Sequence, residues 1–149
     1  MTEEMVTKGI LAFLMSRGWK IVSFDYPQSG TGRALHPRGS LSKTEGVLIP
    51  DIVAVKDGVS IYLENKDHYY HDDFLKVARV LNKKDYAEAF GNVLGVNQET
   101  MLGGVGLPES GCGSISEEDK QLVDFVLKVN DGGLVDVYYK SLNLPVDFL

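Results

Sequence analysis

The alternation of hydrophobic and polar positions predicts a helix followed by three strands in the first half of the chain. Apolar residues recur at helical spacing over residues 6–14, and Gly18 follows as a stop signal. Residues 19–25 then alternate with a period of two, which is typical of a half-buried strand. Residues 51–55 and 59–64 predict two more strands, and the Asp-Gly pair between them predicts a tight hairpin turn.

The second half of the chain predicts two more helices and two more strands. The expected elements are a helix capped by Asp72 or Asp73 with an apolar stripe of Phe74, Val77, Ala78 and Leu81, a strand at 92–96, a helix from Ser116 to Val129, and a last strand at 134–139. Glycine is frequent between residues 103 and 114, so we expect a flexible loop there. The order α-β-β-β-α-β-α-β predicts one α/β domain over residues 1–149 with a mixed sheet.

Composition narrows the class of protein. The chain has 149 residues, of which 44% are hydrophobic and 24% charged, as is typical of a globular domain rather than a disordered or fibrous chain. The single cysteine, Cys112, excludes an internal disulfide, and with only three histidines elsewhere the chain does not predict a zinc site. An acidic N-terminus and the lack of a long apolar run favour a cytoplasmic protein without a membrane segment.

The charge of the chain is unevenly distributed. The net charge of −6 argues at first against a nucleic-acid partner, because phosphate binding favours a basic surface. The expected long loop at residues 26–46 has no acidic residue before position 45, however, and it carries Arg33, Arg38 and Lys43. We expect these three residues to contact DNA, with an ordinary solvated loop as the alternative. Lys76 and other basic residues of the second helix could add phosphate contacts, although a solvated helix face is the simpler explanation.

Two carboxylates and a lysine are expected to meet at one end of the predicted hairpin. Asp51 begins one strand and Glu64 ends its antiparallel neighbour, so hairpin pairing brings their side chains to the same end of the sheet. Glu64 and Lys66 are two residues apart and project from the same face of an extended strand. Carboxylate oxygens suit Mg²⁺, and a nearby lysine stabilises negative charge that develops on a phosphate. The trio therefore suits phosphodiester hydrolysis; a solvated polar strand edge is the alternative.

The pattern Pro50-Asp51 followed by Glu64-Asn65-Lys66 resembles the PD-(D/E)XK nuclease superfamily, which includes restriction endonucleases and archaeal-type Holliday junction resolvases. The resemblance spans residues 3–96 and implies a restriction-endonuclease-like α-β-β-β-α-β core, to which this chain adds a C-terminal helix and strand. It implies that Asp51 and Glu64 bind a metal ion, that the backbone carbonyl of Asn65 is a further ligand, and that Lys66 is the catalytic lysine. Mg²⁺ is the implied cofactor, and Mn²⁺ is expected to substitute for it.

Many members of this superfamily add an acidic residue from the first helix. Glu3 lies on the apolar stripe of the expected helix and should face the sheet, whereas Glu4 is spaced for a surface ion pair with Lys8. The family pattern favours a position near Thr7, which cannot replace a carboxylate ligand. Glu3, Glu4 and the absence of a helix acid are therefore three open alternatives.

The motif and the expected fold together predict a Mg²⁺-dependent DNA endonuclease of the restriction type. Cutting both strands of a duplex with one active site per chain favours a homodimer. Two alternatives stay open: a structure-specific nuclease that resembles Holliday junction resolvases, and a non-catalytic DNA-binding or assembly module with the same fold.

Overall fold

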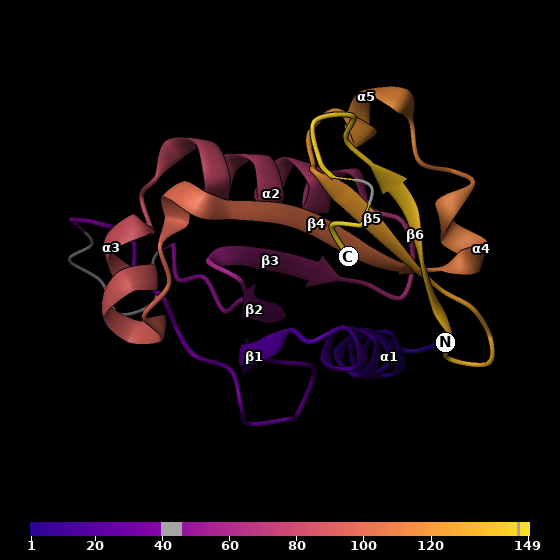
Figure 1. Ribbon diagram of the computed structural model, residues 1–149, viewed down its shortest axis with the longest axis horizontal. Coiled ribbons are helices and arrows are strands. Elements are labelled where there is room, and N and C mark those ends of the chain that lie inside the picture. The colour runs from indigo at the N-terminus through magenta and orange to yellow at the C-terminus, as the bar shows by residue number, and fades with distance from the viewer. Residues whose placement is uncertain (40–45, 146) are drawn as a thin grey trace.

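The computed structural model describes residues 1–39, 46–145 and 147–149, and its central feature is a six-stranded mixed sheet (Figure 1). The strands are β1 (Lys20–Phe24), β2 (Ile52–Lys56), β3 (Val59–Asn65), β4 (Met101–Pro108), β5 (Phe125–Val129) and β6 (Val135–Lys140). They lie side by side in chain order. β3, β4 and β5 run parallel, and the other neighbouring pairs are antiparallel. The predicted α/β class with a mixed sheet is confirmed.

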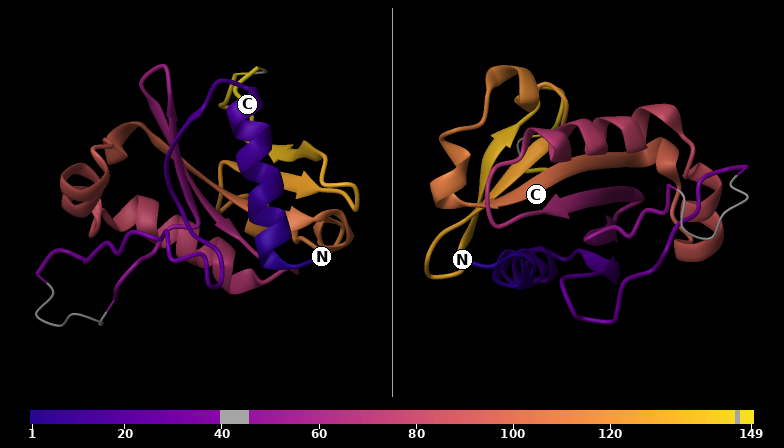
Figure 2. Two further views of the ribbon diagram at one scale, coloured as in Figure 1. Left: turned by 90° about the horizontal axis from the view of Figure 1, so that it is seen from below. Right: turned by 180° about the vertical axis from the view of Figure 1, so that it is seen from behind.

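Two long helices cover opposite faces of this sheet (Figure 2). They are α1 (Glu3–Ser16) and α2 (His71–Lys83). Short helical segments complete the chain: α3 (Ala87–Ala89), a π-helical turn η1 (Phe90–Leu94), a 3₁₀ turn η2 (Gln98–Thr100), α4 (Glu109–Cys112) and α5 (Glu117–Lys120). Each long helix covers a separate hydrophobic core: α1 covers the core around Ile10 and Ile52, and α2 covers the core around Tyr62 and Phe74.

Residues at each end of α1 explain where this helix begins and ends. The Thr2 hydroxyl caps the helix by accepting from the Met5 N–H at 3.1 Å, and two acidic residues in the first turn complement the helix dipole. Gly18 has φ +88°, a conformation that glycine adopts freely, so the chain turns directly into β1. The predicted first helix and first strand are confirmed.

At the start of α2, in contrast, the N-cap is Tyr70 rather than Asp72 or Asp73, and it makes no side-chain capping bond.

The predicted hairpin between β2 and β3 is confirmed, and its register fixes the geometry of the candidate site. Asp57 and Gly58 both have positive φ, at +50° and +80°, as a tight hairpin turn requires. The pairing runs from Lys56 opposite Val59 at the turn to Ile52 opposite Leu63 at the open end. Asp51 directly precedes Ile52, so it continues this register opposite Glu64.

The prediction of a flexible loop over the glycine-rich stretch was wrong, because residues 101–108 form the central strand β4. A Cβ at Gly103 would lie 2.5 Å from Leu81 of α2, and a Cβ at Gly104 would lie 2.3 Å from Phe125. The glycines therefore allow close packing on both faces of the strand. The fourth strand expected at 92–96 was also wrong: most of that segment belongs to η1, which Phe90 anchors in the core.

The predicted helix from Ser116 to Val129 was wrong beyond its first turn. Helical structure ends with α5 at Lys120, and residues 125–129 form β5. Phe125, Val126 and Leu127 are all fully buried, because β5 is covered on both faces. A strand buried on both faces carries a continuous apolar run, which periodicity alone does not distinguish from a buried helix. The last predicted strand is confirmed as β6.

The loop between β1 and β2 starts and ends at the open end of the hairpin, beside Asp51. Leu35 and Leu48 pair across this loop through two backbone hydrogen bonds of 2.7 and 2.9 Å, and both side chains are buried in the core under α2. Farther out, the Arg38 N–H donates to the Asp85 carbonyl just beyond α2. The described part of the loop is therefore attached to the body of the protein. Among the described residues, no helix has the length and apolar character needed to span a lipid bilayer.

Candidate active site

Asp51 and Glu64 lie together at the open end of the β2–β3 hairpin, and both are buried, with 8% and 3% of their surface exposed. Alternation along the strands places both carboxylates on the sheet face that α2 covers, the face of Val53 and Tyr62. The Asp51 Oδ2 atom accepts a 2.7 Å hydrogen bond from the Asn65 N–H. Two acidic side chains are thus held close together out of solvent.

Protein donors occupy one oxygen of the Glu64 carboxylate. The Tyr62 hydroxyl donates to Oε1, and the Lys76 Nζ atom of α2 lies 2.9 Å from the same oxygen. Burial raises the pKa of the Tyr62 hydroxyl well above its ordinary value, and the Glu64 charge raises it further. Tyr62 therefore stays a hydrogen-bond donor at neutral pH. Lys76 supplies the positive charge that this buried carboxylate needs.

Asp51 has no comparable cationic partner among the described residues, and its acidity changes accordingly. Burial and the adjacent Glu64 carboxylate raise the pKa of Asp51 from 3.8 to about 9, although the hydrogen bond from the Asn65 N–H acts in the opposite direction. The pair of carboxylates therefore holds more negative charge than its surroundings neutralise. A site of this kind binds either a proton or an added cation.

Lys66 and Glu3 reach the same region from β3 and from the N-terminus of α1. Lys66 follows β3 directly and makes no ion pair among the described residues. Burial raises the pKa of Glu3, and the nearby Lys66 charge partly offsets that effect, while Glu64 and Asp67 add to it. Glu3 therefore lies within electrostatic reach of the candidate trio. Glu4 is exposed and forms an ion pair with Lys8 at 3.5 Å, so it takes no part in the buried cluster.

The position that the family pattern favours for a helix acid is occupied by Thr7, which is fully buried. Its Oγ1 atom accepts a 3.2 Å hydrogen bond from the Asn65 side-chain amide. The side chain of Asn65 thus points to α1, while its backbone N–H binds Asp51 on the other side of the strand. Asn65 connects the first helix to the candidate site.

Two further charged residues of the cluster come from α2, and the sequence does not assign them to the site. It predicts Lys76 only as a phosphate contact or a solvated residue, and Asp73 only as a helix cap. Asp73 is 8% exposed, and burial raises its pKa to about 6, with the charges of Lys66 and Glu64 acting in opposite directions. The spacing of Asp73 and Lys76, three residues apart, predicts that both lie on one face of the helix. Only the packing of α2 shows that this face lies against the site.

The proposed DNA-contacting residues that the structure describes are exposed and do not belong to the buried cluster. Arg33 and Arg38 are exposed on the β1–β2 loop, and Lys43 lies outside the described residues. The contact of Arg38 with Asp85, beyond the end of α2, places it roughly 15 Å from Asp73 along the helix. A groove of about 230 Å³ runs between α2 and the end of this loop, and Lys76, Arg79 and Leu48 are among the residues that line it.

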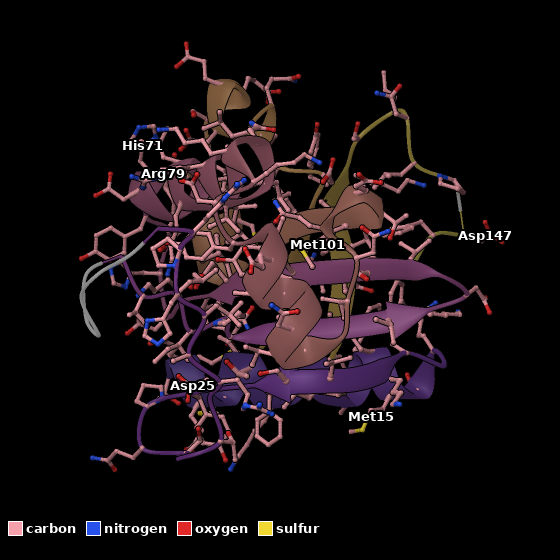
Figure 3. All side chains as sticks on the ribbon, turned by 90° about the vertical axis from the view of Figure 1, so that its left-hand side faces the viewer. Met15, Asp25, His71, Arg79, Met101 and Asp147 are labelled. Atoms are coloured by element: carbon pink, nitrogen blue, oxygen red, sulfur yellow. The ribbon has the colours of Figure 1, made fainter. Side chains whose placement is uncertain are left out.

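Other polar clusters surround the site without joining it. Figure 3 shows Asp25 and His71 on one side of the molecule and Met15 and Asp147 on the opposite side. His71 Nδ1 lies 2.7 Å from the buried Asp119 of α5, which also accepts from the Tyr69 hydroxyl, so both side chains tie the start of α2 to α5.

A cavity of about 650 Å³ opens beside Glu3, between α1 and residues 26–29. A larger one of about 810 Å³ is lined by Asp147 and lies far from the candidate site.

The donors at the candidate site suit a hard divalent cation. Among the described residues, no three or more His, Cys, Asp or Glu side chains form a complete metal-binding cluster. Asp51 and Glu64 nevertheless offer carboxylate oxygens with an excess of negative charge. The Lys66 N–H donates to Gly106 of β4 at 3.1 Å, so in the trans peptide the Asn65 carbonyl points the other way, toward Asp51. Two carboxylates and one carbonyl suit Mg²⁺, which keeps several waters in its shell.

No family model and no curated protein matches this chain. Two solved structures are similar to it. One is a XisH family protein from Nostoc punctiforme PCC 73102, with 13% identity and a TM-score of 0.47 over 89% of this chain and 96% of that chain. The other is an fdxN element excision controlling factor protein from Anabaena variabilis, with 14% identity and a TM-score of 0.48 over 91% and 99%. At these values, neither similarity assigns an activity or a ligand to this chain.

Proposed function

We propose that this chain is a Mg²⁺-dependent DNA endonuclease of the restriction type that hydrolyses phosphodiester bonds. The observation that carries the proposal is the burial of Asp51 beside Glu64 at the end of one hairpin, with Lys66 emerging from the same strand. Two acids held close together out of water destabilise each other unless a proton or a cation neutralises part of their charge. A divalent cation bound by both carboxylates would neutralise this charge, which supports the proposal.

Each residue of the site has a separate role in the proposed reaction. Asp51, Glu64 and the Asn65 carbonyl would hold Mg²⁺, which stabilises charge on a phosphate and lowers the pKa of a nearby water. Lys66 would stabilise the negative charge that develops on the phosphate oxygens as the bond breaks. Tyr62 donates to Glu64 and holds that carboxylate in one orientation. Glu3 is the better candidate for a helix acid, because Glu4 is paired with Lys8 at the surface.

The exposed arginines of the β1–β2 loop suit the substrate class. Arg33 and Arg38 extend from a loop that begins and ends beside the buried acids, so both could contact a duplex that reaches the site. Arginine binds phosphate and guanine through paired donors. A homodimer would bring two such sites to the two strands of a duplex.

The proposal is tested by incubating supercoiled plasmid with the protein and Mg²⁺, beside reactions with EDTA and with Mn²⁺. We expect nicked and linear products with either metal ion, none with EDTA, and none from Asp51→Ala or Glu64→Ala proteins that keep the wild-type circular dichroism spectrum. A four-way DNA junction in the same series separates a restriction-type enzyme from one that resembles resolvases. Binding of DNA without cleavage of any substrate would instead support a non-catalytic module with this fold.

A further inference from the structure

The ammonium group of Lys76 binds the Glu64 carboxylate, which is one of the proposed metal ligands. Lys76 Nζ lies 2.9 Å from Oε1 of Glu64, whose side chain is only 4% exposed. The Tyr62 hydroxyl donates to the same oxygen. Burial alone would lower the pKa of Lys76, but the charges of Glu64, Asp51 and Asp73 outweigh it and raise that pKa above its ordinary value. This lysine is therefore a cation that the metal-free site already contains.

Lys76 is also free to leave this position. Its side chain is 41% exposed, although its charged end reaches a buried carboxylate. It lines the groove between α2 and the β1–β2 loop, so space for a different rotamer lies next to it. A lysine has a flexible four-carbon stem and one compact charge, which suits exchange between two acceptors.

Asp73, one turn earlier on α2, offers the second acceptor. This residue is only 8% exposed, and among the described residues its Oδ2 atom has no hydrogen-bond partner. A buried carboxylate oxygen without a donor is unfavourable, so the fold has a reason to supply one. Residues at i and i+3 of a helix are neighbours, so the Lys76 ammonium can reach Asp73 by a rotamer change. The charges of Lys66 and Lys76 already act on this acid.

We propose that Lys76 competes with a divalent cation for Glu64 and moves to Asp73 when that cation binds. The inference rests on the proposed function, because it requires a cation at Asp51 and Glu64. It assigns Lys76 and Asp73 as positioning residues that set the metal affinity of the site. In the metal-free protein the Glu64 charge is paired with Lys76. In the metal-loaded protein Glu64 binds the cation, and the Lys76 charge pairs with the otherwise unsatisfied Asp73.

The test is a titration of the full-length protein with Mn²⁺, in which electron paramagnetic resonance counts the free ion. Lys76→Met removes the competing charge, so we expect affinity for Mn²⁺ to rise roughly three- to tenfold. Lys76→Arg keeps the charge and should bind as the wild type does. Asp73→Asn removes the negative charge of the second acceptor, so it should weaken binding by a similar factor. Lys83→Met is the matched control, because it removes one exposed positive charge from the same helix and should change affinity little.

The double variant distinguishes exchange from simple electrostatics. If Asp73 acts by receiving Lys76, Asp73→Asn should have little effect once Lys76 is replaced by methionine. An equal loss in both backgrounds would overturn the role of Asp73. Unchanged or weaker binding by Lys76→Met, while Asp51→Asn abolishes binding, would overturn the competition and leave the proposed function intact. No Mn²⁺ binding by either wild type or Lys76→Met would overturn both.

Discussion

The Asn65 side-chain amide donates a 3.2 Å hydrogen bond to the hydroxyl of Thr7, and both residues are fully buried. This bond is where the first helix meets the strand that carries Glu64 and Lys66. Replacing Thr7 by valine keeps the volume but leaves the Asn65 amide without its acceptor, so we expect a loss of about 1–3 kcal/mol in the free energy of unfolding. Urea denaturation measures this loss. Thr7→Ser keeps the hydroxyl and should lose less; equal losses would show that the methyl group matters and the bond does not.

Lys66→Ala should lower the rate of plasmid cleavage by about 100-fold or more, because the proposed contribution of Lys66 is to the charge that develops in the transition state. Folding and DNA affinity should change little, because Lys66 makes no ion pair among the described residues. Cleavage kinetics and a DNA-binding titration in Ca²⁺ test the two statements separately. Cleavage at the wild-type rate would show that another residue stabilises the phosphate charge.

Asp51→Asn should make the metal-free protein more stable at pH 8. Folding raises the pKa of Asp51 from 3.8 to about 9, because burial and Glu64 favour the protonated acid. The stability that protonated Asp51 provides is complete below pH 3.8, and it is lost as the pH rises toward 9. An asparagine carries no charge to lose, so we expect a gain of about 1–3 kcal/mol at pH 8 that vanishes near pH 4.

Thermal melts of wild type and Asp51→Asn across this pH range, with EDTA present, measure the gain. Asp136→Asn is the matched control, because Asp136 is exposed on β6 and should show no such pH dependence. Adding Mg²⁺ should stabilise the wild type more than the variant. A variant that is less stable than the wild type at pH 8 would contradict the proposed excess of negative charge at the site.

Gly104→Ala should destabilise the fold by about 1–3 kcal/mol, because the new Cβ would lie 2.3 Å from the Phe125 ring. Gly113→Ala adds the same methyl group where no other atom lies within 4 Å and where the backbone is already helical. Its stability should stay within about 0.5 kcal/mol of the wild type. Chemical denaturation compares the two variants, and similar stabilities would mean that β4 accommodates side chains that the structure excludes.

Replacing Arg33 or Arg38 by alanine should reduce the slope of log affinity against log salt by ~0.9 for each phosphate that the arginine neutralises. If either arginine reads a base, its removal should instead relax sequence preference at one position by ~1–3 kcal/mol. DNA-binding titrations at several salt concentrations in Ca²⁺ provide both readouts. Lys20→Ala is the control, because Lys20 lies at the opposite end of β1, and its replacement should leave the slope unchanged. If the arginine variants keep the wild-type slope and sequence preference, as expected for this control, then other residues contact the DNA.

Local signals predicted the part of the fold that carries the motif. The Asp57-Gly58 turn and the alternation on either side of it fixed the register, and the register placed Asp51 opposite Glu64. β4 could not be predicted in this way, because its glycines reflect contacts with Leu81 and Phe125 that are distant in sequence. β5 was missed for a related reason: a strand buried on both faces has no alternation to detect.

The site itself was predictable only along the hairpin. Asp51 and Glu64 are brought together by a turn that the sequence encodes locally. Asp73 and Lys76 reach the same point from α2, whose rotation relative to the sheet depends on the packing of the whole helix. The sequence identified both as polar residues of a helix but contained no signal for their distance from Glu64. The roles of all these residues in catalysis are still predictions.

The glycines of β4 affect the candidate site through packing, although they carry no side chains. With one glycine facing Leu81 and others facing Phe125 and Ile10, β4 is thin where α1 and α2 lie across from each other. Close packing of both helices on β4 therefore contributes to the separation between Thr7 of α1 and Lys76 of α2. A displacement of about 1 Å in a catalytic group can lower the rate of an enzyme about 100-fold. A single added methyl group can cause a displacement of this size. We therefore expect a side chain added at these glycines to change the geometry of the candidate site.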